Sequence, residues 1–117
     1  MSAFGSKLRK ADAGIVLFYC PGCRSGHQIR VDPAFGSAWG FNSSGDAPTF
    51  TPSVLVKGSQ RLTEDEYQRV MAGETVKTAE LVCHSFVTDG RIQFLSDCTH
   101  ALAGQTVDLP DWPGGYA

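Results

Sequence analysis

The sequence predicts a small, mainly β protein of the α+β class, built from two β-hairpins and one short helix. Apolar segments of strand length alternate with turn signals, and two of those signals, Cys-Pro-Gly-Cys and Asp-Gly, each separate a pair of such segments. The 117 residues fit one domain, because domains commonly have about 100–150 residues. We expect a single domain over residues 1–117, with a flexible N-terminus (1–13) and a C-terminal extension (106–117).

The first hairpin is predicted around the Cys-Pro-Gly-Cys turn. Residues 15–19 (IVLFY) are β-branched, aromatic or apolar, which is typical of a buried strand. Residues 27–31 (HQIRV) alternate between polar and apolar types, as a half-buried strand does. The cysteines at 20 and 23 therefore lie at the tip of this hairpin.

The middle of the chain predicts a loop, a strand and a helix. Residues 32–53 carry three prolines and are expected to form a loop whose aromatic residues fold back onto the core. Residues 53–57 form the next strand. Thr63 and Glu66 have the spacing of a capping box, so a helix of roughly ten residues begins there. Its apolar stripe is expected to pack against the sheet, and consists of Tyr67, Val70 and Met71.

The second hairpin has the clearest signal. Residues 81–87 and 91–95 flank Asp89-Gly90, a dipeptide that favours a two-residue turn. The resulting register pairs Thr88 with Arg91 and Ser85 with Phe94. Continued outward, the same register brings Cys83 and Cys98 onto one face as diagonal neighbours. His84 falls on the opposite face.

The four cysteines of the chain predict a metal site. Zinc prefers four tetrahedral thiolate and imidazole ligands, and a C-x2-C turn supplies two of them. We expect a zinc knuckle formed by Cys20, Cys23, Cys83 and Cys98, with His100 as the alternative fourth ligand. A site so rich in thiolates is closed, which favours a structural role for the zinc and makes it the clamp between the two hairpins.

The sequence also allows other roles for these cysteines. Cys83 could be a small buried apolar residue, and Cys20 and Cys23 could form a redox pair. A redox pair usually opens a helix, whereas a strand pattern follows here. A disulfide would require an exported protein.

Catalytic residues are not assigned. His27 is expected to be a half-exposed strand residue, and His84 to be packed or hydrogen-bonded, with a functional role as the less favoured alternative. The main catalytic alternative is a zinc-dependent hydrolase or nuclease, with His100 and Asp97 beside an open metal position.

Charge disfavours bulk nucleic-acid binding. Ten basic and twelve acidic side chains give a net charge of −2, whereas proteins that contact phosphates usually carry a basic excess. Binding through Arg24, Arg30 and Lys57 remains a weaker alternative. No apolar run approaches the roughly 20 residues of a membrane-spanning helix, and no signal peptide is evident, so we expect a cytoplasmic protein with no membrane partner.

Three stretches resemble one family: Cys20-Pro21-Gly22-Cys23, the segment PTFTPS at 48–53, and CHSFVTDGRIQFLSDCTHALAGQTVDLP at 83–110. They are similar to small proteins of tailed bacteriophages and prophages, a domain-of-unknown-function family often labelled "ammonia monooxygenase". The resemblance implies a phage or prophage origin and a β-rich zinc-knuckle fold. Ammonia oxidation is excluded, because the chain has neither a membrane span nor a histidine-rich copper site.

The function expected on this basis is that of a phage accessory protein. It would act through protein contacts, with phage structural or host proteins as partners, in the host cytoplasm or as a head, neck or tail component of the virion. The protein could also form a homo-oligomer. The candidate contact residues are Leu109, Trp112 and Tyr116, although Trp112 could equally cover the protein's own core.

Overall fold

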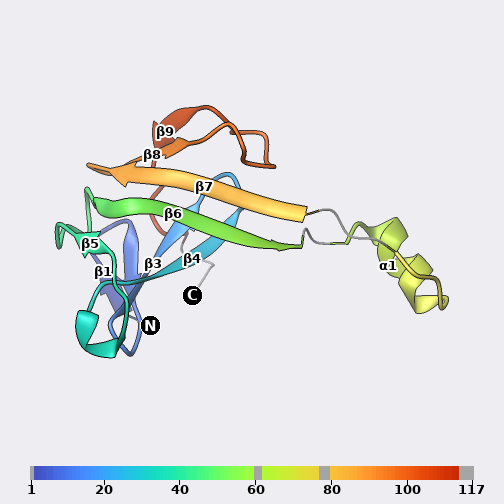
Figure 1. Cartoon of the computed structure of the whole chain (residues 1–117), viewed down its shortest axis with the longest axis horizontal. Coiled ribbons are helices and arrows are strands. Elements are labelled where there is room, and N and C mark those ends of the chain that lie inside the picture. The colour runs from blue at the N-terminus through green and yellow to red at the C-terminus, as the bar shows by residue number, and fades with distance from the viewer. Residues whose placement is uncertain (1, 60–61, 77–79, 114–117) are drawn as a thin grey trace.

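The strands of the protein form two antiparallel sheets. The computed structural model describes residues 2–59, 62–76 and 80–113. The first sheet contains, in order, β1 (Ser2–Phe4), β2 (Leu8–Lys10), β3 (Ile15–Cys20) and β4 (Ser25–Arg30). The second contains β5 (Gly40–Phe41), β6 (Phe50–Ser59), β7 (Glu80–Thr88), β8 (Arg91–Phe94) and β9 (Thr106–Asp108). A 3-10 turn, η1 (Pro33–Phe35), and the helix α1 (Glu64–Met71) complete the described part, so the mainly β prediction is confirmed (Figure 1).

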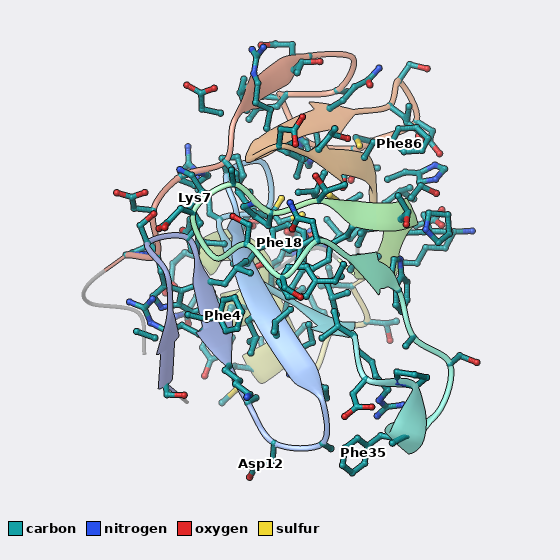
Figure 2. All side chains as sticks on the ribbon, turned by 90° about the vertical axis from the view of Figure 1, so that its left-hand side faces the viewer. Phe4, Lys7, Asp12, Phe18, Phe35 and Phe86 are labelled. Carbon is teal, nitrogen blue, oxygen red and sulfur yellow. The ribbon has the colours of Figure 1, made fainter. Side chains whose placement is uncertain are left out.

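The hydrophobic core lies between the two sheets. Phe18 of β3 is fully buried, and its ring lies 6.0 Å from that of Phe50 in β6, which joins the sheets across the core (Figure 2). Phe41 also stacks on Phe50, with ring centroids 5.0 Å apart. Trp39, Phe41 and Phe50 of the predicted loop therefore do fold back onto the core, but Phe50 does so as the first residue of a strand.

Both predicted hairpins are present. β3 and β4 pair around the cysteine turn, and β7 and β8 pair with Thr88 opposite Arg91 and Ser85 opposite Phe94. Asp89 and Gly90 have φ angles of 49° and 77°. Positive φ at both central residues is what a type I′ hairpin turn requires.

Strand β6 extends the second of these hairpins. It pairs with β7 so that Leu55 lies opposite His84 and Val56 opposite Cys83. The register shifts between Phe50 and Val54, which marks an irregularity just before this pairing. Such irregularities re-aim the side chains next to them, and Ser53 lies within this one.

The N-terminal residues are not the flexible segment that we expected. They supply β1 and β2, which extend the first sheet, and Leu8 is fully buried in the core. The alternating pattern of so short a segment carried too little signal to predict strands. The backbone amide of Lys7 also donates to the carbonyl of Gly45, which ties the segment to the loop before β6.

The predicted helix forms but does not pack on a sheet. Thr63 caps it, and both hydrogen bonds of the capping box with Glu66 are present. The helix stands beyond the end of the β6–β7 pair, and none of its residues is buried (Figure 1). No helix in the described part is long and apolar enough to span a membrane. The expectation of packing was wrong, because the long β6–β7 pair carries α1 away from both sheets.

The C-terminal extension is packed rather than exposed. Residues 106–108 form β9, and Leu109 and Trp112 are 0% and 5% exposed. The Trp112 ring contacts the ring of Tyr19 edge-on at 6.3 Å and lies 5.5 Å from the guanidinium of Arg9. These two residues therefore do not form a contact arm, and Trp112 covers the protein's own core. Tyr116 lies outside the described residues.

A first prediction tests the core between the sheets. Phe18→Ala should lower the free energy of unfolding by about 3–5 kcal/mol, because it empties a fully buried aromatic site. Phe35→Ala is the matched control: Phe35 is 54% exposed, so its truncation should change stability by less than about 0.5 kcal/mol. Urea unfolding of both variants measures the difference, and equal effects would contradict this core.

Candidate functional site

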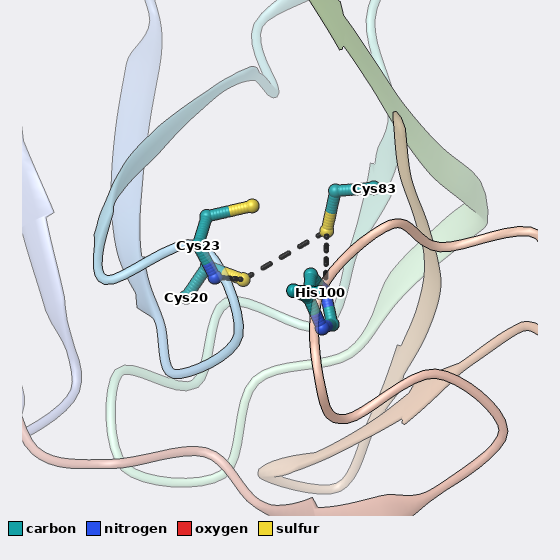
Figure 3. A group of neighbouring side chains, drawn as sticks. All are labelled: Cys20, Cys23, Cys83 and His100. Carbon is teal, nitrogen blue, oxygen red and sulfur yellow. Dashed lines mark hydrogen bonds between the residues drawn. The ribbon is translucent and has the colours of Figure 1, made fainter. Parts of the chain in front are cut away.

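Four side chains from both sheets form a compact cluster between the two hairpins. The ligand atoms of Cys20, Cys23, Cys83 and His100 all lie within 4.8 Å of one another (Figure 3). The Sγ atoms of Cys20 and Cys83 are 3.8 Å apart, and Cys83 Sγ is 3.5 Å from Nε2 of His100. Cys20 and Cys83 are buried, and the other two are half-buried. This group could hold a metal ion in a largely enclosed position.

The turn between β3 and β4 is shaped for this cluster. The backbone amide of Cys23 donates to Cys20 Sγ at 3.3 Å, which is the pattern of a cysteine knuckle. A Cβ atom on Gly22 would overlap the imidazole ring of His100. Glycine at position 22 therefore lets the ring approach the turn closely.

The imidazole of His100 is held from two sides. Its ring packs edge-on against Phe94, with centroids 4.4 Å apart. The backbone amide of Leu102 lies 3.2 Å from Nδ1, so that Nε2 is the nitrogen facing the sulfur atoms. These contacts orient the ring towards Cys83 before any metal is considered.

The thiols of Cys20, Cys23 and Cys83 have shifted pKa values, and the shifts differ in direction. The pKa of Cys20 lies well below its usual value, because its sulfur accepts hydrogen bonds from Cys23 and Cys83. The same bond to Cys20 raises the pKa of Cys23 to about 12 and also raises that of Cys83. Deprotonation is therefore most favourable at Cys20, and metal binding would displace the protons of the other two thiols.

Cys98 lies outside this cluster. The sequence pattern predicted Cys98 as the fourth ligand, with His100 as the alternative, and the structure places His100 there. β8 ends at Phe94, so the chain turns before the register that would have aligned Cys98 with Cys83 can continue. Cys98 Sγ instead accepts a hydrogen bond from the amide of His84 and donates one to its carbonyl, both at 3.2 Å. The same turn carries His100 to the sulfur atoms.

A second group of polar side chains lies on the outer face of the second sheet. Nε2 of His84 is 2.9 Å from Oγ of Ser53, and Nδ1 of His84 is 3.4 Å from Oδ2 of Asp97. A histidine between a hydroxyl and a carboxylate is the arrangement of a Ser-His-Asp triad, which is recognised by geometry and not by order in the chain. The longer His84–Asp97 distance is common in such groups without substrate.

The strands explain how this triad is assembled. Side chains alternate between the two faces of β7, so Cys83 points into the core and His84 points out. Leu55 of β6 lies directly opposite His84, which makes Ser53 a diagonal neighbour on the same face. Asp97 comes from the turn after β8 and reaches the far side of the imidazole ring. The side chains of His84 and Asp97 are 26% and 56% exposed, so the triad is open to solvent.

His84 and Asp97 are both named from the sequence, but the sequence does not place them in one site. His84 was placed on the outer face, which the structure confirms, and Asp97 was named only as a partner of an open metal. Ser53 was missed as a site residue, although it ends the PTFTPS segment at 48–53 that carries the family resemblance. Only the pairing of β6 with β7 brings it to His84. His27 was expected to be half-exposed, but it is 6% exposed and packs edge-on against Phe18 at 5.4 Å.

The residues considered for a zinc hydrolase and for nucleic-acid binding are dispersed over the structure. Asp97 contacts His84 and does not face the metal cluster, so the pair expected for a zinc hydrolase is divided between two sites. Arg24 lies in the turn before β4 and Arg30 is the last residue of that strand, which spans about 17 Å, whereas Lys57 lies on β6 in the other sheet. The three cations therefore do not form one basic patch.

Comparison with known protein families identifies the family of this chain. A family model described as bacterial ubiquitination-like system serine protease (BubE) matches residues 4–95. The chain belongs to the BubE family. The match includes Ser53 and His84 and ends two residues before Asp97. No curated protein and no solved structure matches the chain.

Membership of the BubE family corrects the expected function. A virion component or accessory factor acting through protein contacts was expected from the sequence, whereas the family is one of serine proteases in a bacterial system. The match lends no support to a phage or prophage origin or to the "ammonia monooxygenase" label. The expectation of a phage virion component or accessory factor is therefore wrong.

A second prediction separates the four cluster residues from Cys98. Cys83→Ser should lose bound metal and the cooperative unfolding transition, because metal binding at such a site is part of the folding free energy. Cys98→Ser is the matched control, since a hydroxyl can replace both of its hydrogen bonds to His84. Native mass spectrometry before and after acid gives the metal content of each. A Cys98→Ser protein without metal would assign the fourth ligand to Cys98.

Proposed function

We propose that this BubE family member is a serine protease in which Ser53 is the nucleophile, His84 the general base and Asp97 the residue that orients His84. The observation that carries the proposal is the 2.9 Å contact between Nε2 of His84 and Oγ of Ser53, with Asp97 on the other ring nitrogen. The family description supports it independently, because it names the serine chemistry that this contact permits.

The geometry supports the usual two-step acyl transfer. His84 takes the proton of Ser53 as Oγ attacks the carbonyl carbon of the substrate, and then gives that proton to the leaving amine. A water molecule, deprotonated by His84, hydrolyses the acyl-enzyme and regenerates Ser53. Asp97 holds the imidazole in the tautomer with a proton on Nδ1 and stabilises the positive charge that forms on it.

We further propose that the metal cluster binds zinc with a structural role. Zn–S and Zn–N bonds of about 2.3 and 2.0–2.1 Å set tetrahedral ligand atoms about 3.8 Å (S to S) and about 3.5 Å (S to N) apart. The distances from Cys83 to Cys20 and to His100, 3.8 and 3.5 Å, fit both values. Three thiolates and one imidazole complete the tetrahedron, and the ion would hold the two hairpins together without contacting substrate.

The family description also suggests a biological setting. It refers to a bacterial ubiquitination-like system, so we propose that the bond cleaved lies in a protein of such a system.

A third prediction tests the triad directly. A fluorophosphonate probe should label the wild-type protein at Ser53, and Ser53→Ala should not be labelled. Asp97→Asn should slow labelling by about 10²–10⁴-fold, because the wrong histidine tautomer is then favoured. Ser85→Ala is the control: Ser85 is fully buried on the opposite face, and its hydroxyl has no hydrogen-bond partner among the described residues. Mass spectrometry of the labelled peptide gives the site, and labelling that persists in Ser53→Ala would refute the assignment.

A fourth prediction tests the structural role of zinc. Chelation should abolish labelling together with the folded far-UV and near-UV circular dichroism signals, and added Zn²⁺ should restore all three. Cadmium also favours thiolate ligands, so a cadmium-loaded protein should be labelled within about threefold of the zinc rate, because the metal takes no part in the reaction. A rate that follows the Lewis acidity of the metal would instead indicate a catalytic ion.

A further inference from the structure

The edge of β6 beside Ser53 has no neighbouring strand in the part of the chain that the structure describes. β5 pairs with β6 only at Gly40–Thr51 and Phe41–Phe50. Beyond these pairs, β6 has β7 on one side, and its other side faces no strand (Figure 1). The free edge therefore begins at the proposed nucleophile.

The hydrogen bonds of β7 identify the groups on this edge. The carbonyls of His84 and Val82 accept from the amides of Leu95 and Thr99, both at 2.9 Å, so both residues direct their main chain away from β6. In an antiparallel pair, opposite residues exchange both hydrogen bonds or neither. Their partners, Leu55 and Lys57, consequently direct their N–H and C=O groups away from β7.

One contact already marks the start of the edge. The indole Nε1 of Trp39 donates to the carbonyl of Ser53 at 3.2 Å. Ser53, Leu55 and Lys57 alternate along the strand, so this carbonyl belongs to the same row of outward groups. Trp39 satisfies the first position, and neither Leu55 nor Lys57 has a main-chain partner among the described residues.

We propose that the substrate is an extended polypeptide segment that binds as an added β-strand on this edge, hydrogen-bonded to the main chain of Leu55 and Lys57. The inference rests on the proposed protease function. Addition of a strand to a free sheet edge is a common mode of peptide recognition. Leu55 is about 7 Å along the strand from Ser53, so a ladder bond at Leu55 fixes the substrate within two residues of the nucleophile.

The side chains around the triad favour an apolar side chain on the substrate, in addition to the main-chain hydrogen bonds. Leu55 and Phe86 are 49% and 41% exposed and lie on the face that carries His84 (Figure 2 shows Phe86 at the surface). The rings of His84 and Phe86 have centroids 6.5 Å apart. A substrate residue opposite Leu55 has its side chain on this same face. Cleaved segments should therefore carry an apolar residue next to the scissile bond.

The test uses Leu55→Pro, with Leu55→Ala as its matched control. Proline removes the outward N–H and blocks an added strand, and it breaks no bond to β7, so edge strands tolerate it. A library of tryptic peptides from a bacterial proteome is the substrate, and mass spectrometry detects cleavage. Leu55→Pro should cleave peptides at least about tenfold more slowly than Leu55→Ala, while the fluorophosphonate labels Ser53 at equal rates in both.

A second measurement needs no protein variant. The best-cleaved peptide is resynthesised with one N-methylated amide at a time, and wild-type cleavage is measured. Rates should fall at every second position, because only alternate amides of an added strand face β6. Equal rates across the series, or equal cleavage by the proline and alanine variants, would overturn the edge proposal while labelling of Ser53 still supports the triad. A wild-type protein that is labelled at Ser53 but cleaves no peptide would overturn it too.

Discussion

The pairing of β6 with β7 is the interaction on which the rest of the structure depends. Consecutive residues of β7 point to opposite faces, so this one strand gives Cys83 to the metal cluster and His84 to the triad. The pairing with β6 then decides which serine meets that histidine. A shift of the register by one residue would exchange the faces and dissolve both groups at once. Structure and proposed chemistry are therefore set by the same backbone ladder.

The turn after β8 links the two groups a second time. It places Asp97 on the outer face and, three residues later, His100 beside the sulfur atoms. Between them, Cys98 forms hydrogen bonds with the main chain of His84. Bonds that hold His100 also restrict where Asp97 can lie. The cluster of three cysteines and His100 thus lies on the core side of β7, and the proposed triad lies on the outer side. No residue belongs to both groups.

Much of the fold was predictable because its signals are local. The Asp-Gly turn fixed the register of β7 and β8, and the Cys-Pro-Gly-Cys turn located the first hairpin; the capping box of α1 began where Thr63 indicated. The remainder depends on contacts between distant segments. Whether His100 or Cys98 meets Cys83 is decided by the turn that follows Phe94, and the burial of Trp112 depends on its contacts with Tyr19 and Arg9. Ser53 ends the PTFTPS segment, but the segment does not indicate a catalytic role, which becomes visible only once β6 and β7 are paired.

A free strand edge has a consequence for the solution behaviour of the protein. Two copies could pair through it in the way that sheet edges join in aggregates, and natural proteins often counter this with a lysine on the exposed edge. Lys57 occupies that position here and is exposed. An antiparallel pair of copies would bring the two ammonium groups near each other along the shared edge, at a cost that rises as salt is removed. Under the proposed mode of substrate binding, Lys57 therefore disfavours pairing between two copies while the edge stays accessible to a substrate strand.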